Sequence, residues 1–159
     1  MDLLTQVESR VAKKLQAVEA WAAELASDPK GVAPDELERR CRDLGLAVAH
    51  EVLDLLWAHY GTGDQGPAVQ CPCGGTRRRR GLRPRTLRDL MNRPLTVRRA
   101  YYFCATCGQG WLPLDEALGL PAPAVTPGLF EVAVTCGSVA PPDEAAELLE
   151  RVAGLQLRA

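Results

Sequence analysis

Apolar residues recur every three or four positions over the first 25 residues, which is the spacing of one face of a helix. The face consists of Leu4, Val7, Val11, Val18, Trp21 and Leu25, interrupted at Lys14 with Leu15 beside it. A stripe this narrow suits a helix that packs lengthwise along another helix. The pattern therefore predicts a long first helix from about Leu4 to Leu25.

A second periodic segment begins after the break Ser27-Asp-Pro-Lys-Gly-Val-Ala. Pro34 followed by Asp35 and Glu36 is a typical helix start, because proline fits the first helical position and acids favour the first turn. Its apolar face, ending near Tyr60, is formed by Leu37, Cys41, Leu44, Val48, Val52 and Leu55. We expect residues 1–62 to form an antiparallel two-helix hairpin, with residues 1–60 available for pairing with a second copy as a homodimer.

The periodicity changes to that of strands after the glycine-rich joint Gly61–Pro67. Residues 85–90 and 95–103 are predicted to be strands, the second supported by its β-branched and aromatic residues, and residues 91–94 provide a turn between them. Alternation places Leu95, Val97, Arg99 and Tyr101 on one face of the second strand. It places Thr96, Arg98, Ala100 and Tyr102 on the other. Arginine is therefore expected on both faces.

Short helices are predicted for residues 114–159. Thr126 is a helix cap with Pro127 at the first helical position, and that helix is expected to run to about Val139. Another helix is expected from Glu144 to Ala153, stopped by Gly154. A short helix, a glycine turn and then Leu-Gln-Leu is how a helix-turn-helix begins. The fold class is therefore predicted as α+β, mainly helical, with an incomplete helix-turn-helix at the end.

Charge divides the chain into three parts, although the formal net charge is only -1. Residues 1–64 carry seven Lys/Arg against twelve Asp/Glu, residues 65–110 ten against one, and residues 111–159 two against seven. All ten central positive charges are arginine, whose planar fork suits phosphate and guanine edges. We expect a nucleic-acid partner, double-stranded DNA first, contacted by Arg77, Arg78, Arg79, Arg80, Arg83, Arg85, Arg88, Arg98 and Arg99.

Two close cysteine pairs flank the arginine-rich segment. Cys71 and Cys73 precede Gly74, and Cys104 and Cys107 precede Gly108. Two thiolates on one tight turn can share a metal only if the backbone curls sharply, which a glycine with positive φ permits. The pattern predicts a zinc ribbon over residues 68–113 with one structural Zn²⁺. The alternatives are four free buried thiols, or two disulfides of a secreted domain.

The cellular compartment affects the choice between a zinc site and disulfides, because disulfides persist only in oxidising compartments. Charged and polar residues recur through the first twenty positions, unlike a signal peptide, so a reducing cytoplasm is expected. No apolar run approaches the roughly 20 residues of a membrane span. Outside the two pairs, Cys41 and Cys136 are expected to pack as small hydrophobes. His50 and His59 have no partner ligand at helical spacing and are not expected to bind metal.

Over roughly residues 35–157 the chain resembles the amino-terminal part of bacterial ISKra-type insertion-sequence transposases. The resemblance rests on Cys71-Pro-Cys-Gly-Gly, Arg99-Ala-Tyr-Tyr-Phe-Cys104-Ala-Thr-Cys107-Gly, Pro113-Leu-Asp-Glu-Ala-Leu-Gly119, Thr126-Pro-Gly-Leu and Glu144-Ala-Ala-Glu-Leu-Leu-Glu followed by Ala-Gly-Leu. It implies a zinc-ribbon and helical DNA-binding region, with zinc on Cys71, Cys73, Cys104 and Cys107. It implies no catalytic residue within these positions.

In that family, an RNase H-like catalytic domain with three metal-binding carboxylates follows. These 159 residues include neither that domain nor the recognition helix of a helix-turn-helix. We therefore expect a nucleoid-associated DNA-binding protein that is not an enzyme, with a separately encoded catalytic or effector protein as a further partner. The alternative is an accessory subunit in which the ribbon is a structural module that binds a partner protein or RNA.

Overall fold

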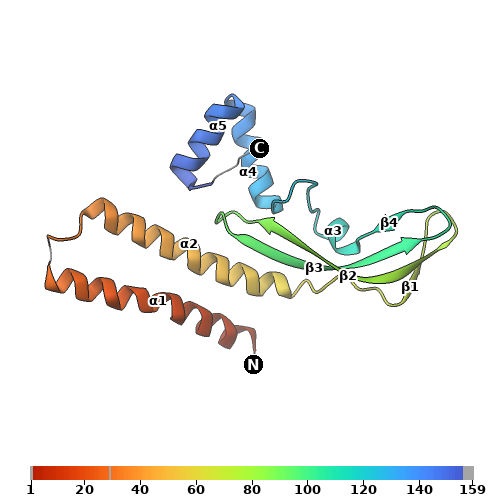
Figure 1. Cartoon of the computed structure of the whole chain (residues 1–159), viewed down its shortest axis with the longest axis horizontal. Helices are drawn as coiled ribbons and strands as arrows, with labels where there is room; N and C mark the ends of the chain where they lie inside the picture. The colour runs from red at the N-terminus through yellow and green to blue at the C-terminus, as the bar shows by residue number, and fades with distance from the viewer. Residues whose placement is uncertain (1, 29, 156–159) are drawn as a thin grey trace. The chain divides into compact units, whose positions relative to one another are not determined.

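The computed structural model describes residues 2–28 and 30–155 as an α+β protein, in agreement with the predicted class (Figure 1). Two compact units share the chain, Met1–Leu56 and Trp57–Ala159. The three-part division into residues 1–62, 68–113 and 114–159 stays a prediction. Within the described ranges, no helix has the length and apolar character needed to cross a bilayer.

The first unit is the expected pair of helices, α1 (Leu3–Ser27) and α2 (Pro34–Ala58), which run antiparallel in Figure 1. The Asp2 carboxylate caps α1 by accepting the N–H of Thr5 at 2.8 Å. Asp35 and Glu36 occupy the first turn of α2, as predicted. Both helices lie within about two residues of the bounds predicted from the sequence, because their start signals are local.

Charged residues join the two helices. Arg10 reaches Asp54 at 2.7 Å, and the ammonium of Lys14 reaches Glu51 at 3.0 Å. At the other end of the hairpin Arg40 reaches Glu24 at 2.6 Å. Lys14 therefore interrupts the apolar stripe because it faces α2. These pairs are partly exposed, so each stabilises the hairpin only modestly.

The apolar stripes are covered less than the sequence led us to expect. None of the described side chains of α1 is buried, and in α2 only Leu55 is. Cys41, which was expected to pack in the apolar face, is exposed. That expectation was wrong because a hairpin of two helices has no third element to cover the outer edge of the stripe.

The second unit contains a four-stranded antiparallel sheet in the order β1 (Ala68–Gln70), β2 (Thr76–Arg88), β3 (Pro94–Cys104) and β4 (Gly110–Trp111). The predicted second strand is confirmed as β3. The first strand was predicted to start at residue 85, but β2 starts nine residues earlier and pairs with β3 from Arg77 to Arg88. A bulge between Arg79 and Gly81 lets the arginine run continue within the strand.

The turn between β2 and β3 is organised by Asp89, which is fully buried. Its carboxylate accepts the N–H groups of Met91 at 2.9 Å and Arg93 at 2.8 Å. Asn92 takes a positive φ of 61°, a conformation that asparagine tolerates better than most residues. The turn therefore lies about two residues earlier than the predicted 91–94.

The buried face of the sheet changes halfway along β3. Leu95, Val97 and Arg99 are buried in the first half, and Ala100, Tyr102 and Cys104 in the second. In the first half, Leu114 of α3 (Pro113–Ala117) packs with Leu87 and Val97. In the second half, the Tyr102 hydroxyl accepts the N–H of Gln65 and donates to Asp64, both at 2.8 Å. Different segments thus cover opposite faces at the two ends of the sheet.

The helices after the sheet begin and end near their predicted positions. They are α4 (Pro127–Val139) and α5 (Pro142–Leu148), which continues into a π-helical turn at Leu149–Ala153. Thr126 caps α4, as predicted, and Gly154 ends the last turn with a φ of 66°. Cys136 packs against a core of Leu129, Leu149 and Leu155, which confirms its packing role. The Gln156 and Leu157 of the predicted helix-turn-helix lie outside the described residues.

Arg99 connects the sheet to the segment that follows it. Its side chain is 10% exposed and pairs with Asp115 of α3 at 2.5 Å. Arg85 lies 3.6 Å from the same carboxylate and donates to the carbonyls of Pro121, Ala122 and Pro123. These two arginines hold α3 and the proline-rich link against β2 and β3.

Replacing Arg99 by alanine should destabilise the second unit by about 2–3 kcal/mol, because Asp115 would remain partly buried with only Arg85 nearby. The matched control is Arg98→Ala, since Arg98 is the exposed neighbour on the same strand. The control should change the free energy of unfolding by less than about 0.5 kcal/mol. Denaturant unfolding of both variants measures this; equal effects would contradict the assigned role of Arg99.

Candidate metal centre and arginine surface

The two cysteine pairs lie in turns at the same end of the sheet. Cys71 and Cys73 lie between β1 and β2, Cys104 ends β3, and Cys107 precedes β4. In the first turn the N–H of Gly74 donates to Cys71 O, and in the second the N–H of Gly108 donates to Cys104 O, both at 2.9 Å. Both glycines have the positive φ that was anticipated, 83° and 69°. Strand pairing therefore brings together two turns that are 30 residues apart in the chain.

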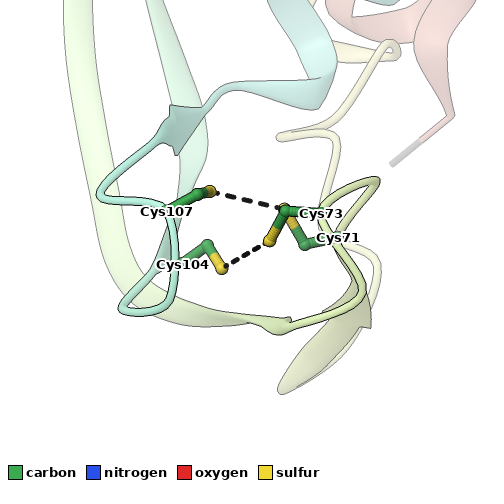
Figure 2. Close-up of side chains that lie close together, drawn as sticks. All are labelled: Cys71, Cys73, Cys104 and Cys107. Atoms are coloured by element: carbon green, nitrogen blue, oxygen red, sulfur yellow. Dashed lines mark hydrogen bonds between the residues drawn. The ribbon is translucent and has the colours of Figure 1, made fainter.

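The four cysteine sulfurs point toward one another (Figure 2). Cys71 Sγ lies 3.8 Å from Cys107 Sγ, and Cys73 Sγ lies 3.7 Å from Cys104 Sγ. All four sulfurs are within 4.8 Å of one another. A tetrahedron with metal–sulfur bonds of about 2.3 Å has sulfur–sulfur edges of about 3.8 Å. The four cysteines can therefore bind one metal ion, and their positions fit that geometry closely.

The same sulfur–sulfur distances argue against the two alternatives to a metal site, which were two disulfides and four free buried thiols. A disulfide joins its sulfurs at about 2.05 Å, far shorter than the separations here. All six cysteines of the chain are free thiols. Cys71 and Cys104 are buried, whereas Cys73 and Cys107 are exposed, so four inert buried thiols do not describe the cluster either.

Backbone N–H groups prepare one sulfur for binding. The N–H of Cys107, with help from that of Thr106, lowers the pKa of the Cys104 thiol to about 6, although burial acts in the opposite direction. At Cys73 the N–H of Gly75 favours the thiolate, but the neighbouring sulfurs of Cys71 and Cys107 outweigh it and raise the pKa to about 12. Four crowded thiolates repel one another, so a cation is needed for all four to be ionised.

Gly75 is a structural requirement that sequence reasoning missed. A Cβ at this position would lie 2.5 Å from Thr106 Oγ1 and 3.2 Å from Cys104 Sγ. The two turns therefore pack directly on each other at Gly75. This close packing brings Cys71 and Cys73, which are separated by one residue, to the cysteines of the second turn, which are separated by two. The signal was the second glycine of Cys-Pro-Cys-Gly-Gly.

Three arginines of β2 are held against aromatic rings. The guanidinium of Arg77 lies 4.9 Å from the ring centre of Trp111, that of Arg80 lies 5.8 Å from Phe103, and that of Arg83 lies 3.7 Å from Tyr101. These cation–π contacts orient the side chain without cancelling its charge. Arg80 and Arg83 are exposed, whereas Arg77 is half-buried.

Other predicted arginine contacts are bound within the protein. Arg99 and Arg85 hold Asp115 and the proline-rich link, and Arg79 pairs with Asp64 at 3.1 Å. Arg88 donates to Asn92 at 2.9 Å but is itself exposed, as are Arg78 and Arg98. The structure therefore separates arginines that carry the fold from those that present charge to solvent.

Comparison with protein-family models, with curated proteins and with solved structures found no match for this chain. The resemblance to insertion-sequence transposases therefore stays a prediction from the motifs of the sequence. His50 and His59 do not belong to the four-residue ligand cluster found among the described residues.

The cluster predicts one tightly bound metal ion per chain. Cys104→Ser should abolish binding, because it removes a central sulfur, whereas Cys41→Ser should keep the full metal content, since Cys41 is exposed and outside the cluster. Elemental analysis of the purified proteins measures the ratio of metal to chain.

Metal removal should selectively unfold the second unit around the sheet. Segment-resolved hydrogen exchange should show lost protection in residues 70–112 after chelation, while α1 and α2 stay protected, because the small sheet depends on the metal. Unchanged protection of residues 70–112 after complete metal removal would contradict this.

Proposed function

We propose that the four cysteines bind one structural zinc ion and that the sheet they stabilise binds DNA through its exposed arginines. The sulfur tetrahedron supports the metal, and the ring-held arginines of β2 support the DNA interface. The observation that carries the proposal is the pairing of Arg80 with Phe103 and of Arg83 with Tyr101 on the sheet.

Zinc is the ion best matched to four thiolates in a tetrahedron. Four protein ligands leave no open position for a catalytic water, so the role of the ion is structural. The ion would link the turn after β1 to the turn after β3 and thereby hold the arginine-bearing strands in register. We assign no catalytic step to this chain.

DNA is favoured by the kind of partner each arginine has. A carboxylate neutralises an arginine, as Asp115 does for Arg99. An aromatic ring leaves the charge in place and restricts the side chain, so less entropy is lost when the guanidinium meets a phosphate. Segment 65–110 has ten arginines and a single acid, Asp89, which is buried in the hairpin turn. The exposed surface of this sheet therefore attracts polyanions.

The most concentrated part of this surface is formed by Arg78, Arg80 and Arg83, which we name the arginine face. In the register of β2 and β3, Arg78 is directly opposite Phe103, and Arg83 is directly opposite Arg99. On β3, Arg99 shares one side of the strand with Tyr101 and Phe103. Since alternate residues share a side of a strand, Arg78 and Arg83 lie on the side of Tyr101 and Phe103. Arg80, next to the bulge, reaches the same ring system.

Replacing the arginine face by serine, as Arg78→Ser, Arg80→Ser and Arg83→Ser together, should weaken duplex DNA binding at least tenfold. The slope of log affinity against log salt should fall by about three, because each lost phosphate contact removes about one released counterion. A salt titration of duplex binding, followed by fluorescence anisotropy, measures both quantities.

The matched control removes three exposed cations from the first unit: Lys13→Ser, Lys30→Ser and Arg42→Ser. It changes the net charge by the same amount and should leave the salt slope within about one of the native value, since it removes no proposed phosphate contact. Equal losses in both variants would indicate nonspecific charge, and an unchanged slope in the arginine-face variant would remove these residues from the interface. Tighter binding to RNA than to duplex DNA would favour the accessory-subunit alternative.

A further inference from the structure

A mostly apolar row along α1 is largely exposed in the single chain; it consists of Leu4, Glu8, Val11, Leu15, Val18, Ala22 and Leu25. Leu4 is 67% exposed, Leu15 is 47% exposed and Val18 is 41% exposed, although the three- and four-residue spacing of the whole row is that of a helix-packing seam. Val11 and Leu25, on the same row, are only half-buried. Soluble helices seldom keep such a seam in water, so a partner is expected here.

Packing against α2 covers only a small part of this row. The side of α1 that faces α2 carries Arg10 and Lys14, which pair with Asp54 and Glu51. Successive residues turn by about 100° around a helix, so the row from Leu4 to Leu25 lies beside the charged seam, on its open flank. The ionic contacts thus join the two helices and leave most of the row exposed.

The hairpin also lacks an interior of its own. Two helices enclose no core, and among the described residues α1 and α2 together bury only Leu55. A unit of this size hides too little apolar surface to be stable without help. Two hairpins packed together would form a four-helix bundle, in which such rows become the core.

The order of residues along the row identifies the partner. In the sequence, the point halfway between Leu4 and Leu25 is also the point halfway between Val11 and Val18. This point falls between Lys14 and Leu15. If a second α1 is laid antiparallel, leucine therefore meets leucine, valine meets valine, and Leu15 lies beside Leu15 of the second copy. This self-complementarity is what a twofold interface requires.

We propose that the hairpin pairs with a second copy of this chain through an antiparallel α1–α1 contact, forming a four-helix bundle. A helix of 25 residues is about 37 Å long. If the faces of both helices take part in the bundle, over a width of about 20 Å, the buried strip would be about 750 Å² per subunit, close to the roughly 800 Å² of a standard stable interface. Glu8, the charged residue of the row, would face the small Ala22 and extend its carboxylate past it to solvent.

This inference is independent of the proposed DNA binding, because it rests on the first unit alone. Pairing would place two arginine faces in one particle. The second face would then bind DNA as an effectively intramolecular event, and affinity would rise without a new contact.

The oligomeric state of the full chain tests the proposal by sedimentation over a wide concentration range. The native protein should have twice the mass of one chain. Val11→Glu should produce monomers, because in the antiparallel arrangement each new carboxylate opposes Val18 of the other copy. Val18→Lys should do the same. The double variant Val11→Glu with Val18→Lys should recover the dimer. Each interface would then contain two glutamate–lysine pairs, one on each side of the twofold axis.

The double variant separates pairing geometry from loss of folding. A parallel pair would set glutamate against glutamate and lysine against lysine, so recovery occurs only in the antiparallel arrangement. Ala20→Glu with Gln16→Lys is the control, because these exposed positions carry the same charge changes on the far side of α1 and should leave the dimer intact. A native chain that is monomeric at every concentration, or a double variant that stays monomeric, overturns the proposal.

Discussion

Four sulfur atoms held within a few ångströms are the constraint on which the second unit depends. Cys71 and Cys73 follow a strand of three residues, and Cys107 precedes a strand of two. Strands this short contribute few ladder hydrogen bonds, so pairing stabilises β1 and β4 only weakly. A shared cation would join the two turns directly. Such closure would also fix the strand positions that carry Arg77 and Phe103.

Arginine serves two physical roles in this protein, and its neighbours decide which. Arg99 pairs with the Asp115 carboxylate, and Arg85 donates to backbone carbonyls. Both guanidinium groups therefore stabilise the fold and are not available to a partner. Arg80 and Arg83 meet aromatic rings, which leave the charge available to solvent. Since arginine cannot lose its proton in a protein, an arginine without an acid remains a permanent cation. The proposed interface is thus defined by where acids are absent.

The two units illustrate different ways of stabilising a small body. Near the turn between β2 and β3, α3 covers one face of the sheet. Near the cysteines, residues around Gln65 cover the opposite face. The first half of β3 is therefore buried on one face and the second half on the other. The helical hairpin has no such covering segment and relies on surface ion pairs, which are individually weak. The exposed apolar row on α1 would therefore gain stability from association.

Local signals by themselves determined the helix bounds, the capping at Thr126, the strand β3 and the two close cysteine pairs, because each depends on residues a few positions apart. The early start of β2 was not visible locally, since an arginine run has no strand pattern until β3 lies beside it. Nor could sequence distinguish Arg98, which is exposed, from Arg99, which is buried. That difference arises from Asp115, 16 residues away, and only tertiary packing brings a distant carboxylate to one arginine and not to its neighbour.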